Sequence, residues 1–187
     1  MVSTTITSVL TIIFLIFTVR LLADGLGAEE FGAYSLARRI LTMIEPISTL
    51  CMGFALTRYT AMTKEYNQGS SYLAAGTSIV FLITFTIVLL GFVFSDFFSR
   101  AIFYDNSPDL LFLELLAMVA SYSFYIVIYS YYRGLGRMTT ANIWQISLIG
   151  IGPFLIAYQF SSSGSANLVL FLMSSILLVA LFPLFKE

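Results

Sequence analysis

Long runs of apolar residues, separated by short polar connections, dominate this chain. They predict six helices, at about residues 4–22, 33–62, 72–95, 109–132, 141–160 and 167–185. Each run is close to or longer than the roughly 20 residues that a helix needs to cross a bilayer. A membrane strand would alternate over about ten residues, whereas residues 80–94 are almost continuously apolar. The pattern predicts an all-α integral membrane protein, with residues 1–187 forming one six-helix transmembrane bundle.

The composition agrees with a lipid environment. Hydrophobic residues make up 59% of the chain and charged residues 10%, with a mean hydropathy of +0.94. A soluble domain carries roughly 25% charged residues. The net charge of −1 gives no reason to expect nucleic acid as a partner. With no histidine and a single cysteine, Cys51, we expect no disulfide, metal site or cofactor.

The distribution of lysine and arginine favours cytoplasmic N- and C-termini. With that orientation, five basic residues of the connections lie inside and two outside, where cytoplasmic loops usually carry the excess. The inner residues are Arg58, Lys64, Arg133, Arg137 and Lys186, and the outer ones are Arg20 and Arg100. The expected location is therefore the cell membrane, crossed several times.

The second predicted helix carries charges inside its apolar run. A charge at the bilayer centre costs at least about 2.5–3.5 kcal/mol on insertion scales. One stripe of this helix, at 3.6 residues per turn, contains Arg38, Thr42, Glu45 and Thr49. One interpretation is a hydrated cationic wall, with Arg38 and Arg39 binding a phosphate-bearing substrate and Glu45 linked to an ion or proton. The other is that both arginines extend to the outer interface.

Hydroxyl-bearing residues occupy one face of the fourth predicted helix. The candidate substrate contacts there are Tyr122, Tyr125 and Tyr129. Aromatic rings with hydroxyl groups can stack on sugars and donate hydrogen bonds. Helix packing with tyrosines at the membrane interface explains the same pattern. In the fifth predicted helix, Gly150, Gly152 and Pro153 weaken the backbone ladder, which permits either a hinge or a static kink.

Three motifs, in order along the chain, resemble one known family. The most specific combines RLL at 20–22 with LGAEEFGAYS at 26–35, and its turn contains Gly27, Glu30 and Gly32. The others are GFALTRY at 53–59, and YRGLGR at 132–137 followed by Asn142. They resemble the polysaccharide biosynthesis membrane proteins. That family includes lipid-linked oligosaccharide flippases of the O-antigen type, within the multidrug/oligosaccharidyl-lipid/polysaccharide exporter superfamily.

The resemblance implies a transporter rather than an enzyme. Such proteins usually have two lobes of six helices, with a cationic cavity between the lobes for a polyprenyl-phosphate-linked glycan. This chain would supply one lobe, so we expect an N-terminal fragment that needs the missing C-terminal lobe or, as the alternative, a second copy. At position 51 the resemblance leads us to expect a small residue, often glycine.

Three other functions remain as alternatives. A multidrug exporter of the same superfamily is disfavoured by the arginines of the second helix, which would repel a cationic drug. A non-transporting scaffold for glycan assembly would use the same helices. An intramembrane enzyme acting on polyprenyl phosphate would need clustered carboxylates or a histidine, and Glu45 and Glu114 are isolated in sequence.

Overall fold

The structure, a computed structural model, describes residues 2–62, 66–103, 109–161 and 165–179. Every element in these ranges is helical, which confirms the all-α fold. The helices are α1 (Val2–Leu26), α2 (Ala28–Thr49), α3 (Met52–Met62), α4 (Tyr66–Val93), α5 (Ser95–Phe103), α6 (Asp109–Gly134), α7 (Met138–Gln145), the π-helical segment η1 (Ile146–Ile151), α8 (Gly152–Phe160) and α9 (Ala166–Leu178).

Four described stretches are long and apolar enough to cross a membrane. They are Thr4–Leu26, Gly69–Val93, Leu110–Gly134 and Met138–Phe160. The pair α2 and α3, bent by 47°, passes the same test as one broken span and would be the fifth. Helix α9 is a shorter apolar helix of 13 residues, and positions 180–185 of the sixth predicted run lie outside the described residues. The chain is therefore a multi-pass membrane protein, and its sixth span stays a prediction.

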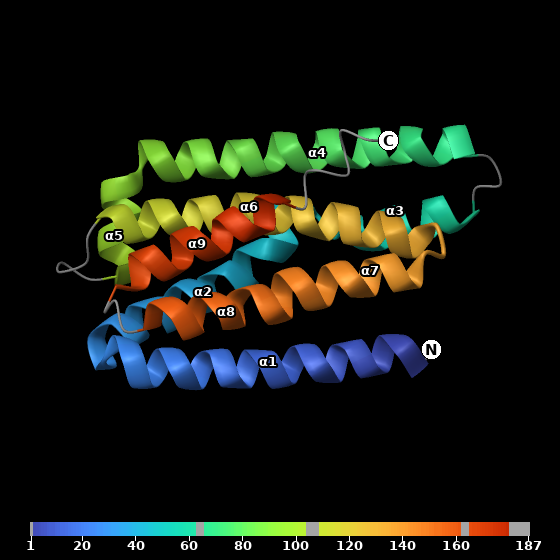
Figure 1. Ribbon diagram of the computed structural model, residues 1–187. Coiled ribbons are helices and arrows are strands. Elements are labelled where there is room, and N and C mark those ends of the chain that lie inside the picture. Colours follow the sequence, from blue (N-terminus) through green and yellow to red (C-terminus); the bar gives the residue numbers. More distant parts are fainter. Residues whose placement is uncertain (1, 63–65, 104–108, 162–164, 180–187) are drawn as a thin grey trace.

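The long helices run side by side, with α1 and α4 at opposite edges (Figure 1). Helix α6 lies at the centre, packed against α2, α3, α4 and α9. Within its apolar window 61% of the residues are buried, against 17% for α1 and 22% for α4. Fully buried Leu115, Leu170 and Met173 form part of the core between α6 and α9. The bundle is thus organised around α6, with much of α1 and α4 left for lipid or partners.

Small and hydroxyl-bearing residues allow α2 and α3 to approach α6 closely. The Ser48 and Ser123 hydroxyls are hydrogen-bonded at 2.8 Å. A Cβ added to Gly53 would lie 2.7 Å from the Ser130 hydroxyl oxygen. A Cβ on Gly134 would lie 2.7 Å from the Thr60 Cβ. Close backbone approach at small residues is how membrane helices gain van der Waals packing.

The helix predicted over 33–62 is two helices, α2 and α3, which corrects the expectation of one continuous helix. Pro46 lies inside α2, and the break comes four residues later, at Leu50 and Cys51, with φ of 45° and 53°. Just before it, the hydroxyls of Ser48 and Thr49 both donate to the Glu45 carbonyl oxygen, at 3.0 and 2.9 Å. Such side-chain bonds compete with continuation of the helix.

Two connections also differ from their predicted form. The turn expected over 23–32 shrinks to Gly27, because α1 continues to Leu26 and α2 begins at Ala28. Gly27 has φ of +80°, a conformation that side chains with a Cβ rarely adopt. The connection after the third predicted helix contains α5, whose residues Phe97 and Phe98 are exposed.

Candidate functional site

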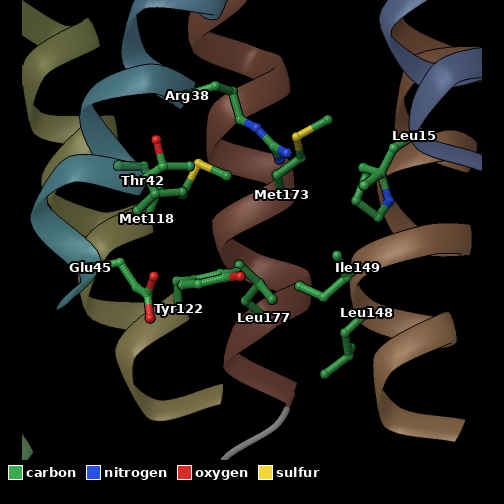
Figure 2. A pocket seen from close by; sticks show the side chains of 12 residues that line it. Leu15, Arg38, Thr42, Glu45, Met118, Tyr122, Leu148, Ile149, Met173 and Leu177 are labelled. Atoms are coloured by element: carbon green, nitrogen blue, oxygen red, sulfur yellow. The ribbon is translucent and has the colours of Figure 1, made fainter. Parts of the chain in front are cut away.

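A cavity of about 150 Å³ lies inside the bundle, between α1, α2, α6, η1, α8 and α9. Its polar side chains are Arg38, Thr42, Glu45 and Tyr122, which brings together residues that sequence reasoning proposed from two helices. Figure 2 shows the Arg38 guanidinium and the Tyr122 ring directed into the space bounded by Met173, Leu177 and Ile149. The remaining walls are apolar.

Arg38 and Glu45 line the same cavity but do not pair with each other. Seven residues apart on one helix, they are separated by roughly 10 Å of rise. In the described part of the chain, no side chain forms an ion pair with either of them. Charged groups in a largely apolar wall need a counter-charge or water. A liquid water occupies about 30 Å³, so the cavity has room for about five waters or a phosphate-sized anion.

Arg39, in contrast, lies outside this cavity. Its side chain is exposed, and it is not among the residues that line this cavity. Neighbouring residues of a helix differ by 100° in direction, so Arg38 and Arg39 cannot both face the same small space. Thr42 is exposed at the rim of the cavity, which therefore opens on the uncovered face of α2.

A second cavity, of about 360 Å³, lies beside the break between α2 and α3. Glu45 belongs to the walls of both cavities, and the candidate residue Thr49 lines only this one. Sequence reasoning did not propose this site. Its lining is Glu45, Pro46, Thr49, Cys51, Gly53, Phe54, Thr57, Ile126, Tyr129, Ser130 and Arg133.

The three candidate tyrosines of α6 connect the two cavities. Tyr122 lines the first and Tyr129 the second, whereas Tyr125 is buried between them and lines neither. The rings are in contact in sequence: Tyr122 and Tyr125 are tilted at 42° with centroids 5.7 Å apart, and Tyr125 and Tyr129 are stacked with centroids 5.8 Å apart. The Tyr129 hydroxyl donates to Gln145 Oε1 at 3.0 Å. Tyr125 therefore belongs to the packed core in this structure, as the packing interpretation expected.

The turn of the family motif connects α1 and α2 to the helices that pack beside them. The Ala166 N–H donates to Glu30 Oε2 at 2.7 Å, so Glu30 caps the first turn of α9. A Cβ on Gly25 would lie 2.7 Å from the carbonyl oxygen of Ser161, which shows how closely α1 approaches the end of α8. A Cβ on Gly32 would have nothing within 4 Å, so the fold gives no steric reason for glycine there.

The Gly150, Gly152 and Pro153 cluster coincides with the π-helical segment. η1 ends at Ile151, directly before Gly152 and Pro153, and Leu148, Ile149 and Pro153 line the first cavity. Proline removes one backbone donor, and a π turn is one way in which a helix accommodates the interruption. Single π turns are frequent at functional sites.

The described residues contain no group of three or more His, Cys, Asp or Glu side chains that could hold a metal ion. The chemistry that the two cavities offer comes from single charges, hydroxyl groups and aromatic rings. Such groups can form hydrogen bonds and charge interactions with an anionic, partly apolar molecule.

Comparison with known proteins identifies one family. The family whose model matches is described as polysaccharide biosynthesis protein, and the match covers residues 1–187. No curated protein and no solved structure matches the chain.

Proposed function

The chain belongs to the polysaccharide biosynthesis protein family, and from this premise we propose that it transports a lipid-linked oligosaccharide or polysaccharide precursor across the cell membrane. The translocation step would use alternating access. The transported molecule would be a glycan attached to a polyprenyl phosphate, and the protein would act as a carrier without enzymatic chemistry.

One observation supports this proposal above the others: Arg38, Thr42, Glu45 and Tyr122 surround one cavity within a membrane bundle. An arginine offers bidentate hydrogen bonds to a phosphate and keeps its charge at any physiological pH. The volume of about 150 Å³ suits the phosphate part of the substrate and not its saccharide. The saccharide would then lie beyond the Thr42 rim, where a second lobe or a second copy of the chain would close over α2.

A helix that can bend beside the substrate would assist alternating access, in which one bundle rocks against another. The π-helical segment η1 and the adjacent Pro153 supply such a place, since both contribute to the cavity wall. Glu45, shared between the cavities, is the carboxylate that we propose to couple transport to an ion or a proton.

The charged residues at the two ends of the bundle support a proposed orientation. The end at which α3 and α6 terminate carries Arg58, Arg133 and Arg137, and no carboxylate among the residues described. Helix α1 begins at this end (Figure 1). By the positive-inside rule we place this end in the cytoplasm, with the N-terminus and, after an even number of spans, the C-terminus.

The test is complementation of cells that lack the corresponding flippase. Arg38→Gln should reduce surface glycan about tenfold or more, because a hydrogen bond to a charged group contributes roughly 1.5–3 kcal/mol. Glu45→Gln should also reduce surface glycan, because a neutral amide cannot couple transport to an ion or a proton. Arg39→Gln is the matched control and should retain most of the activity, since its side chain is exposed and outside both cavities.

Protein abundance in the membrane must be equal for each variant. Full complementation by Arg38→Gln at normal abundance would remove the role proposed for the cavity. An export assay with cationic drugs discriminates the multidrug alternative, for which drug efflux rather than surface glycan would depend on Glu45.

A further inference from the structure

The second cavity has a shape that comes from the break between α2 and α3. Because the two helices bend by 47°, they leave a groove along α6 of about 360 Å³, within the range of roughly 300–1,000 Å³ typical of ligand sites. Its exposed lining residues include Cys51 and Phe54, and Phe54 is 83% exposed. The groove therefore opens sideways, on a face of α2 and α3 that no other described helix covers.

The groove is cationic at one end. Arg133 lies in the last turn of α6, and its Cζ atom is 5.5 Å from the centroid of the Tyr129 ring. No ion pair joins Arg133 to a carboxylate in the described ranges. Arg58 and Arg137 lie at the same end of the bundle. An anionic headgroup would meet an excess of positive charge there.

The body of the groove is mainly apolar. Pro46, Phe54 and Ile126 form its sides. The Thr57 hydroxyl bonds within the protein, at 2.9 Å from the Gly53 carbonyl oxygen and 3.1 Å from that of Ser130. A ligand with a hydrocarbon body and one anionic end matches this arrangement.

We propose that this groove binds the polyprenyl phosphate carrier of the substrate, with the phosphate at Arg133 and the prenyl chain along Phe54 and Ile126. This inference rests on the proposed function and deepens it, since it names an entry site for the lipid part. The groove is bounded by only three helices and suits one hydrocarbon chain, whereas a bilayer phospholipid carries two. Glu45 closes its inner end and belongs also to the first cavity, so the two sites are adjacent.

Cys51 provides a direct probe, because it lines the groove, is exposed, and is the only cysteine in the 187 residues. The protein in lipid nanodiscs is treated with N-ethylmaleimide, and alkylation of the peptide that contains Cys51 is followed by mass spectrometry. Polyprenyl phosphate at about ten times its Kd should slow alkylation about tenfold, because about 90% of the sites are then occupied. Polyprenol without phosphate, and phosphatidylglycerol at the same mole fraction, should protect much less.

Two pairs of variants test the contacts. Arg133→Gln should weaken protection about tenfold, since it removes the charge-assisted bond, whereas Arg58→Gln, an exposed arginine at the same end outside the groove, should not. Ile126→Trp should fill the groove and abolish protection, whereas Ile143→Trp, on the exposed surface of α7, should leave it unchanged.

Equal protection by phosphatidylglycerol, or protection that survives Arg133→Gln, would overturn the inference. The outcome is separable from that of the proposed function. If Cys51 is protected but Arg38→Gln transports normally, the role of the first cavity fails and the groove stands. If Arg38→Gln abolishes transport while polyprenyl phosphate gives no protection, only the groove fails.

Discussion

At the scale of single residues, Glu30 links two helices that are far apart in the sequence. Its Oε2 atom accepts the Ala166 N–H at 2.7 Å, whereas Ser165, at the N-cap position of α9, forms no side-chain cap bond. The first N–H groups of a helix have no partner within the helix, and a carboxylate there also interacts favourably with the helix dipole. Glu30 thus supplies from α2 the cap that α9 lacks locally.

Replacing Glu30 by alanine should therefore destabilise the bundle. Loss of an N-cap costs about 1 kcal/mol, and up to about 2. The measurement is the unfolding midpoint in detergent micelles. The matched control is Glu29→Ala, which also removes a carboxylate from the first turn of α2 but breaks no hydrogen bond to the described part of α9, and it should change stability by less than about 0.5 kcal/mol. Equal losses for both variants would show that the cap is unimportant.

Arg38 and Arg39 illustrate a second point at this scale. They are identical in chemistry and adjacent in sequence, yet only Arg38 lines the cavity. The structure places Arg38 in the wall of a cavity and Arg39 on the exposed surface of α2. Which arginine reaches the cavity depends on the direction in which its side chain leaves the helix and on which helix packs against that side. Residue types alone do not give this information.

At the scale of elements, the contact of α3 with α6 depends on backbone approach. A Cβ on Gly134 would lie 2.7 Å from the Thr60 Cβ and 3.0 Å from the Thr57 carbonyl oxygen. The latter atom belongs to the backbone and can move only if α3 moves. Since α3 also forms one wall of the groove, this packing holds Phe54 and Arg133 in their relative places.

Gly134→Ala should consequently separate α3 from α6. Overpacking of this kind costs about 1–3 kcal/mol. Gly32→Ala is the control, because its Cβ would meet nothing within 4 Å and alanine is favoured over glycine inside a helix by roughly 0.5–1 kcal/mol. Thermal unfolding in micelles should show opposite shifts for the two variants. A rise in stability for Gly134→Ala would contradict the close packing.

The break between α2 and α3 is the second feature at the element scale. Leu50 and Cys51 adopt the left-handed conformation, which costs roughly 1–2 kcal/mol for a residue with a Cβ. The glycine that the family resemblance led us to expect at position 51 would adopt this conformation without strain. The strain is tolerated where the bend creates the groove, and strained backbone tends to concentrate at functional sites.

At the scale of the whole molecule, charge is distributed unequally between the two ends of the bundle. The end with Arg58, Arg133 and Arg137 carries no carboxylate among the residues that the structure describes. The opposite end holds both signs, namely Arg20, Asp24, Glu29, Glu30, Asp96 and Arg100. Helix α3, the end of α6 and the α6–α7 connection, which carry these three arginines, therefore lie at the same end of the bundle.

Cysteine accessibility tests this orientation. In a background with Cys51→Ser, Arg137→Cys and Asp24→Cys place single thiols at exposed positions on opposite ends of the bundle. A membrane-impermeant maleimide added to intact cells should label position 24 and should reach position 137 only after permeabilisation. The reverse result would invert the proposed topology, and the groove would then open toward the outer leaflet.

The structure agrees with the sequence wherever the deciding property is local. The apolar runs predicted the main spans, since every backbone group in a lipid-exposed segment must be satisfied within its own helix. The helix boundaries differ from the predicted ones where several contacts together determine whether a helix continues. Helix continues through most of 23–32, and the Ser48 and Thr49 hydroxyls help to interrupt it beyond Pro46.

By itself, therefore, the sequence determined the all-α membrane class, the family, and the stripe on which Arg38, Thr42 and Glu45 lie. The class and the stripe follow from hydrophobic length and helical period, which are properties of a short stretch of chain, whereas the family follows from the motifs and the family match. Only the tertiary structure decided that Arg39 and Tyr125 lie outside the cavities, and that Arg133 borders a groove. Those outcomes depend on which helix packs against which face, and the groove at the bend between α2 and α3 exists only because α6 supplies its third wall.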